Sequence, residues 1–255
     1  MRTRRLFAAI GALGLMVIAV GWRGAEEWRG FGMNPSLAAM STGATVTGVV
    51  KFRGTPPTMP AVDMSKEPEC RDHYASPPRD QAVVVDDNGA LSSVFVYVKA
   101  GLDDNVRDAV PRDSAWIDQV NCRYEPHVLG AQVGQRIAIR NSDSVLHNVN
   151  AKPTLNRGFN ISQPAQGMVS SRKFRAPEVM VRIVCDVHGW MTAYVGVLPH
   201  PYFVTTGDDG SFAIPDLPPG TYTIEAWHEK YGTQTVEVTV GTDETKAIEF
   251  TFEAG

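Results

Sequence analysis

The sequence predicts an all-β protein, and three observations support this fold class. Short segments rich in Val, Ile, Thr and aromatic residues recur along the chain. Turn signals such as Asp87-Asn88-Gly89 and Pro218-Pro219-Gly220 separate them. The 23 Gly and 17 Pro in 255 residues favour many turns over long helices. Many short strands between such turns are typical of β-sandwiches and barrels.

The strand-like segments can be placed in chain order. Tyr222, Ile224 and Ala226 show the pattern well, because they alternate with Thr and Glu at the period of two that buries one face of a strand. One segment, 102–110, suits a short helix. The expected strands are 44–52, 82–85, 94–98, 128–133, 136–140, 180–184, 192–197, 202–205, 222–227, 234–240 and 247–252.

The first 24 residues predict export. Arg2, Arg4 and Arg5 precede an uncharged apolar stretch, residues 6–22, in the order of a signal sequence. The Arg4-Arg5 pair resembles the twin-arginine export signal. The apolar stretch is at the lower limit of a bilayer span, so a cleaved signal peptide and an uncleaved membrane anchor both stay open. In either case we expect a periplasmic or otherwise extracytoplasmic protein.

Charge and motifs exclude several classes of function. The net charge is −4, and residues 1–24 contain four Arg and no acidic residue, so the rest of the chain is more acidic still. An acidic chain is a poor partner for nucleic acid or an anionic membrane surface. The sequence also lacks a Gly-x-Ser-x-Gly elbow, a phosphate-binding glycine loop and a His-Glu-x-x-His helix. We therefore expect no nucleic-acid partner and no enzymatic activity.

The three cysteines, Cys70, Cys122 and Cys185, divide into a pair and a single thiol. In an oxidising compartment Cys70 and Cys122 could form a disulfide. Their spacing to His73 and His127 also allows a second metal site made of these four residues. The disulfide is the simpler of the two alternatives for an exported chain, and it leaves Cys185 as the free thiol.

Candidate metal ligands are concentrated between two expected strands. Cys185, His188 and Met191 lie in one short segment, and His147 lies upstream in a second polar segment. One thiolate, two imidazoles and a thioether are the donors of a mononuclear copper electron-transfer centre. The segment holds no second Cys for a binuclear copper centre. The pattern therefore predicts one copper ion.

The sequence Cys-x-x-His-x-x-Met after a strand, with Asn-x-Asp-x-x-x-His-Asn-Val upstream, resembles the cupredoxin family. The resemblance covers roughly residues 115–200, and the short ligand loop is most similar to that of amicyanin. It implies a Greek-key sandwich with a type 1 copper ion bound by His147, Cys185, His188 and Met191. It further implies that Asn148 helps to hydrogen-bond the thiolate.

In the cupredoxin family the loop histidine lies near the surface and is the usual electron port. The resemblance therefore implies that His188 lies near the surface and forms this port. The neighbouring Trp190 either flanks this port or packs inward beneath the site. These two alternatives stay open from the sequence.

The C-terminal part resembles a second family, the carboxypeptidase regulatory-like (transthyretin-like) β-sandwich, through its Asp-Gly turn and its Leu-Pro-x-Gly-x-Tyr turn near residue 220. Residues 44–52 also resemble an opening strand of such a sandwich, so the cupredoxin unit could be inserted into it. The expected organisation is a signal peptide or anchor (1–24), a linker (25–43), an N-terminal β-strand region (44–114), a cupredoxin domain (115–200) and a smaller immunoglobulin- or transthyretin-like sandwich (201–255).

Together these features predict an exported blue copper protein that transfers single electrons between a redox-protein donor and acceptor. Membrane attachment through the N-terminal segment stays open. Two alternatives are kept: a periplasmic protein that binds and delivers copper, and a structural β-protein of the cell envelope without a redox role.

Overall fold

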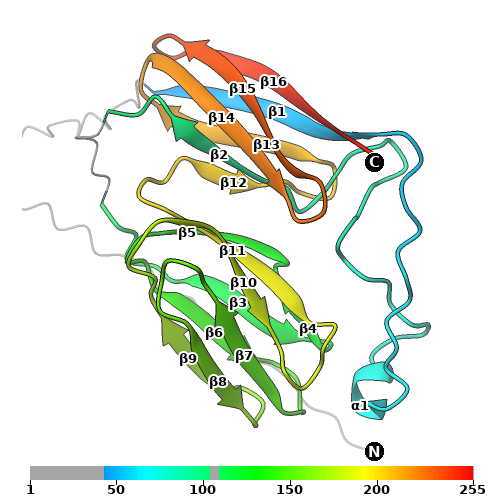
Figure 1. The fold of residues 1–255 in the computed structure, drawn as a ribbon. Helices are drawn as coiled ribbons and strands as arrows, with labels where there is room; N and C mark the ends of the chain where they lie inside the picture. The colour runs from blue at the N-terminus through cyan, green and yellow to red at the C-terminus, as the bar shows by residue number, and fades with distance from the viewer. Residues whose placement is uncertain (1–42, 104–108, 255) are drawn as a thin grey trace, which may run out of the picture. The chain divides into compact units, whose positions relative to one another are not determined.

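A computed structural model describes residues 43–103 and 109–254. The expected export signal, nearly all of the expected linker and most of the expected helix at 102–110 lie outside the described residues. Within the described residues, no helix is long and apolar enough to span a membrane. The described chain forms four β-sheets and one short helix, which confirms the all-β fold class (Figure 1).

Two of the sheets pack into a first sandwich around a shared apolar core, which includes Val46, Val96, Ile214, Ile224 and Phe250. One sheet has the strand order β13-β1-β16 and the other β12-β2-β14-β15. The strands are β1 (Ala44–Arg53), β2 (Phe95–Ala100), β12 (Phe203–Thr205), β13 (Ser211–Leu217), β14 (Gly220–His228), β15 (Gly232–Val240) and β16 (Thr245–Glu253).

The first strand of the chain pairs with the last. β1 runs parallel to β16 from the pair Thr45–Thr245 to the pair Arg53–Glu253, and it runs antiparallel to β13. The chain thus begins the first sandwich with β1 and β2, leaves it, and returns with β12 (Figure 1). This order is the one expected when the second sandwich is inserted between strands β2 and β12 of the first.

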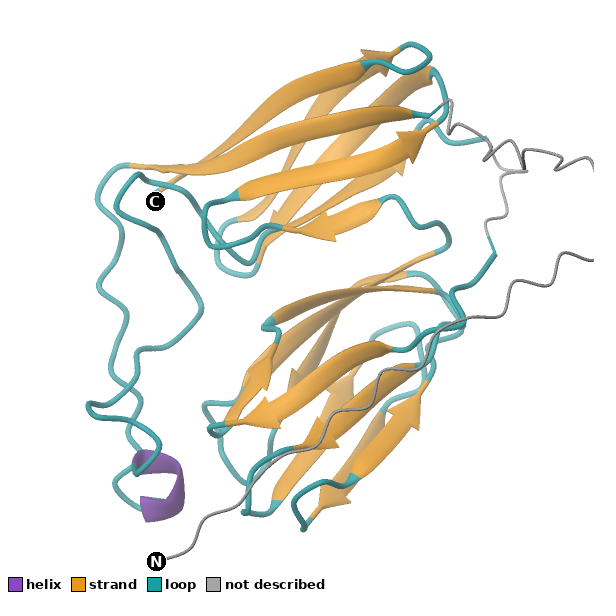
Figure 2. Ribbon diagram, turned by 180° about the vertical axis from the view of Figure 1, so that it is seen from behind, coloured by secondary structure: helices purple, strands orange, loops and turns teal. Residues whose placement is uncertain are grey.

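The second sandwich is built from the strands between β2 and β12. Its sheets have the orders β5-β11-β10-β7-β8 and β4-β3-β6-β9, and they are seen from behind in Figure 2. Its buried core includes Ile117, Val149, Ile183, Cys185 and Met191. The strands are β3 (Ala115–Val120), β4 (Arg123–Glu125), β5 (Val128–Gln132), β6 (Ile137–Asn141), β7 (His147–Lys152), β8 (Phe159–Gln163), β9 (Val169–Arg172), β10 (Glu178–Val184) and β11 (Thr192–Leu198).

Residues 54–94 connect β1 to β2 and carry the helix α1 (Pro68–Arg71), which the sequence did not predict. The expected strand at 82–85 is wrong, because this segment forms only an isolated bridge between Val85 and Leu91. Two Asx turns explain the difference. The carboxylate of Asp80 accepts the amide of Ala82, and that of Asp86 accepts the amides of Asn88 and Ala90, so the backbone turns at both ends.

The strands β3, β4, β7, β8, β9 and β13 were not among the expected ones. Short length and polar composition explain part of the omission, because β7 and β9 show no clear run of apolar residues. β7, for example, reads His-Asn-Val-Asn-Ala-Lys, and its His and Asn side chains are buried in the interior. These polar strands contribute much of the candidate site.

Candidate metal centre

The pairing of three strands brings the predicted ligands together. β10 lies between β7 and β11 and pairs antiparallel with both. Val184, the last residue of β10, is opposite Asn150 of β7 and Thr192 of β11. Cys185 therefore emerges at the end of the sheet where β7 starts with His147, and the loop that follows Cys185 must return to β11 at the same end.

The loop from Cys185 to Met191 is closed by its own backbone. The amide of Cys185 donates to the carbonyl of Met191 at 3.2 Å, and the amide of Met191 donates to the carbonyl of His188 at 2.9 Å. The amide of His188 also donates to Sγ of Cys185 at 3.4 Å. These bonds hold the thiol and the imidazole on the same side of a tight loop.

Three donor atoms converge in the interior. Nδ1 of His147 lies 2.9 Å from Nδ1 of His188, and Sγ of Cys185 lies 3.9 Å from Nδ1 of His188. Nitrogen and sulfur ligands at roughly 2.0–2.3 Å from one ion, as in zinc sites, lie about 3–4 Å from each other. Met191 is 1% exposed and belongs to the same core. A thiolate, two imidazoles and a neighbouring thioether fit copper by their donor chemistry.

The environment of Cys185 favours its ionised form. Burial alone raises the pKa of this thiol, but hydrogen bonds from His147, His188 and the backbone of Asn148 oppose burial and bring the pKa down to about 6. Metal ions bind the thiolate rather than the thiol. The site therefore presents a soft, ionised ligand near neutral pH.

Asn148 lies beside the thiol, where the resemblance places it. Its Oδ1 accepts hydrogen bonds from Sγ of Cys185 at 3.3 Å and from the amide of Asp186 at 2.6 Å. The carboxylate of Asp186 is held in turn by the side-chain amides of Asn148, Asn150 and Asn160, at 2.8–2.9 Å. This network fixes the first half of the ligand loop against β7 and β8.

Asp143 is a functional residue that the sequence analysis did not assign. Its Oδ2 lies 2.8 Å from Nε2 of His147, and its carboxylate accepts the amides of Asn121 and Cys122. Burial raises the pKa of Asp143, but these hydrogen bonds outweigh burial and lower the pKa below its ordinary value. A carboxylate on Nε2 leaves Nδ1 of His147 free to bind a metal and orients the ring. The sequence signal that could have identified Asp143 is its position four residues before His147.

The side chain of His188 is buried, and only 2% of it is exposed. The electron port near the surface that the resemblance implies at this residue stays a prediction. Sγ of Cys70 lies 3.6 Å from Nε2 of His188, and a carboxylate oxygen of Glu67 lies 3.9 Å from it. Residues 54–94, which we name the cap segment, thus cover the ligand with α1 and its neighbours. The sequence could not show that this distant segment returns to the site.

Trp190 packs inward, which decides between the two alternatives for this residue. Its ring centroid lies 5.2 Å from that of His188, and its Nε1 donates to the carbonyl of Cys122 at 3.0 Å. The indole therefore links the ligand loop to the residue that anchors the cap segment.

Cys70 and Cys122 form a disulfide with a Cα–Cα distance of 5.5 Å. The structure shows this disulfide and not the alternative, a metal site made of the two cysteines with His73 and His127. His127 is hydrogen-bonded to Glu229, and His73 lies 3.9 Å from the carboxylate of Asp143. Cys185 is the free cysteine, and it is buried.

Comparison with known proteins gives one family match and several structural likenesses. Residues 192–253 match the carboxypeptidase regulatory-like domain family. The match begins in β11, which belongs to the second sandwich, and continues through β12–β16 of the first. No curated protein matches the chain.

Among solved structures, the chain is similar to a copper-containing nitrite reductase from Thermus scotoductus, with 17% identity and a TM-score of 0.33, over 40% of this chain and 26% of that one. It thus spans about a quarter of that reductase. A purple cupredoxin from Nitrosopumilus maritimus is similar at 23% identity and a TM-score of 0.29, over 33% of this chain and 99% of that one. A mutant of amicyanin in the Cu(I) form is similar at 18% identity and a TM-score of 0.30, over 40% of this chain and 97% of that one.

Because these TM-scores are near 0.3, the structural likenesses provide no basis for inferring a metal site. That inference rests on the donor atoms alone. The chain combines a β-sandwich that carries the buried cluster of His147, Cys185, His188 and Met191 with a segment that matches the carboxypeptidase regulatory-like domain family.

Proposed function

We propose that this protein is an extracytoplasmic copper protein that carries single electrons between a redox-protein donor and a redox-protein acceptor. The observation that carries the proposal is the convergence of Nδ1 of His147, Sγ of Cys185 and Nδ1 of His188 within 4.8 Å of one another in a buried site. Copper bound there would supply one-electron cycling between Cu(I) and Cu(II), for which this mixed donor set is suited.

Each residue of the site has a distinct part in this proposal. Cys185 provides the thiolate, His147 and His188 provide the two imidazole nitrogens, and Met191 provides the thioether. Asp143 holds the ring of His147, and the loop hydrogen bonds hold His188 and Met191. The strands and the Cys70–Cys122 disulfide would hold these groups in place when copper is bound. A rigid, buried ligand set of this kind favours electron transfer over catalysis, since a catalytic metal keeps an open position for substrate.

An extracytoplasmic location is part of the proposal. Two features support it: the Arg-rich start followed by apolar residues 6–22, and the disulfide between Cys70 and Cys122. Disulfides persist in oxidising compartments and are rare in the cytosol. Attachment to the membrane through the N-terminal segment remains compatible with both features.

The test is a titration of the full chain with Cu(II), followed by visible spectroscopy and voltammetry. We expect one equivalent of copper, an intense blue thiolate-to-copper band and reversible one-electron cycling. The matched control is Cys185→Ser, which keeps the size of the side chain and should abolish the band. Tight Cu(I) binding without reversible cycling would instead favour copper delivery, and no copper uptake would favour a structural role.

A further inference from the structure

The disulfide between Cys70 and Cys122 lies directly against the metal ligand His188, on the side of the ring that faces away from Cys185. His188 turns Nδ1 toward His147 and Cys185 and turns Nε2 toward Sγ of Cys70, 3.6 Å away. The two sulfur atoms and a nitrogen of His188 lie within 4.8 Å of one another, and all three residues are buried. Two sulfurs and an imidazole nitrogen therefore surround a second point in the interior.

We propose that Cys70 and Cys122, once reduced, form a second metal site with Nε2 of His188, and that this site takes Cu(I). A dithiol would supply two electrons and two protons to the S–S bond and become a disulfide itself. Binding of Cu(I) would then release the two thiol protons. Two thiolates and an imidazole are soft ligands that select Cu(I). This inference does not depend on the electron-transfer role proposed above.

The spacing of the donors suits such an ion. Sulfur and nitrogen ligands at about 2.3 and 2.0 Å from one metal lie roughly 3.5–4 Å apart. The 3.6 Å between Sγ of Cys70 and Nε2 of His188 is already of this size. Only the two sulfur atoms must separate, which the cleavage of their bond permits. A carboxylate oxygen of Glu67 lies 3.9 Å from Nε2, and its negative charge would oppose rather than support a site made of two thiolates and one Cu(I).

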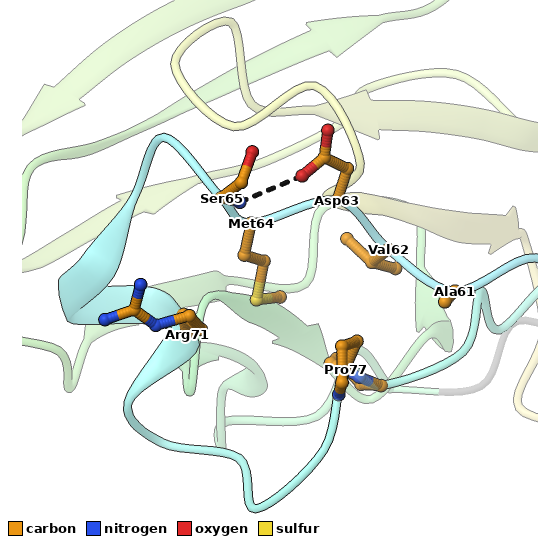
Figure 3. A pocket seen from close by; sticks show the side chains of 8 residues that line it. Ala61, Val62, Asp63, Met64, Ser65, Arg71 and Pro77 are labelled. Atoms are coloured by element: carbon orange, nitrogen blue, oxygen red, sulfur yellow. Dashed lines mark hydrogen bonds between the residues drawn. The ribbon is translucent and has the colours of Figure 1, made fainter.

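The disulfide is one of several contacts that hold the cap segment against the second sandwich. Its buried contribution to the core of the second sandwich comes from Met64 and Cys70. A pocket of about 290 Å³ lies within the segment, where the side chain of Met64 is seen between Arg71 and Pro77 (Figure 3). One further tie is the hydroxyl of Tyr74, which donates to the carbonyl of Asn121 at 2.7 Å. Loss of the covalent bond would leave this hydrogen bond and the apolar packing of Val62, Met64 and Tyr74.

The two sites share His188, so they cannot both bind a metal through a neutral imidazole. A neutral imidazole has one nitrogen that accepts a metal and one that carries a proton. Filling both positions would require the ring to lose its second proton. The second site is therefore expected to compete with the first for His188, so reduction of the disulfide would couple thiol redox state to the copper held by Cys185.

The experiment uses the full chain with Cys185→Ser, in which the thiolate of the first site is absent. The protein is reduced with dithiothreitol, freed of it by anaerobic gel filtration and titrated with Cu(I) against a chromogenic Cu(I) chelator. We expect the reduced form to bind one more equivalent of Cu(I) than the oxidised form. X-ray absorption at the copper edge should show two sulfur neighbours and at least one nitrogen neighbour.

The matched control is the triple variant Cys70→Ser, Cys122→Ser and Cys185→Ser, which should gain no equivalent after the same treatment. In a second variant, His188→Asn with Cys185→Ser, the nitrogen neighbour should be lost while the sulfur neighbours remain. Equal Cu(I) binding by the oxidised and reduced forms would overturn the proposal. So would a disulfide that resists the dithiol in the folded protein, as counted by thiol labelling. The proposed function is tested separately, by the blue band of the oxidised chain with Cys185 present.

Discussion

Sγ of Cys70 lies 3.6 Å from Nε2 of His188, although 118 residues separate them in the chain. This contact places a disulfide against a candidate metal ligand and covers the histidine for which the sequence predicted a position near the surface. The cap segment thereby becomes part of the candidate metal centre.

Removal of the disulfide should destabilise the metal-free protein. The variant Cys70→Ser with Cys122→Ser opens a loop of 52 residues, for which chain entropy suggests a loss of about 4 kcal/mol in the free energy of unfolding. Chemical denaturation of the two metal-free proteins measures this difference. Loaded with copper, the variant should also release the metal faster to a chelator, because the cap over His188 is no longer tethered. Unchanged release would show that the cap does not restrict access.

Loss of the carboxylate on His147 should weaken metal binding. In Asp143→Asn an uncharged amide replaces the carboxylate whose Oδ2 lies 2.8 Å from Nε2 of His147. Changes to such partners of a ligand typically cost about 10- to 100-fold in metal affinity. Competition with a chelator gives the affinity. Asp72→Asn serves as the control, because Asp72 is exposed and pairs with Arg71 on the cap segment. An equal effect of both variants would argue against a specific part for Asp143.

A side chain at Gly48 should destabilise the first sandwich. A Cβ atom there would lie 2.2 Å from the carbonyl oxygen of Ile248 and 2.5 Å from the ring of Phe212. Because the first neighbour is backbone of the paired strand, relief requires β1 and β16 to move apart. We expect Gly48→Ala to lower the free energy of unfolding by about 1–3 kcal/mol. Gly189→Ala in the metal-free protein is the control, since no atom lies within 4 Å of its Cβ. Equal denaturation midpoints would contradict the strand packing described above.

His228 should make stability fall in mild acid. Burial lowers its pKa to about 4, from an ordinary value of 6.5, so the folded protein keeps the ring neutral. Between these two values the unfolded chain binds a proton that the folded chain does not. Stability therefore falls as the pH drops from 6.5 toward 4, by up to about 3 kcal/mol.

The variant His228→Phe isolates this effect, because it keeps a ring of similar size that cannot be protonated. Denaturation at pH 7.5 and at pH 5 should give a smaller difference for the variant than for the original chain. Both proteins share the remaining titratable groups, so the quantity to compare is how steeply the free energy of unfolding changes with pH in each protein. Identical slopes would show that His228 does not carry the proton uptake.

Local sequence was sufficient for the parts of the site that lie close together along the chain. Cys185, His188 and Met191 occupy one loop between two strands, and the spacing alone brings their side chains to one side. The strands with a clear period of two, such as β14 and β15, were predicted for the same reason. The strands β7 and β8 were missed, because their buried Asn and Gln side chains are satisfied by partners distant in sequence, such as Asp186 for Asn150 and Gln119 for Gln163.

By itself, then, the sequence determined an all-β chain, the identity of the candidate ligands and the pairing of cysteines favoured for an exported protein. Only the tertiary structure decided that the cap segment covers His188, that Asp143 holds His147 and that Trp190 packs inward against Cys122. The physical reason is that periodicity and loop spacing report contacts between neighbours in the chain. Contacts between remote segments depend on how the sheets pair and pack, and on the Cys70–Cys122 disulfide that holds α1 against the end of the second sandwich.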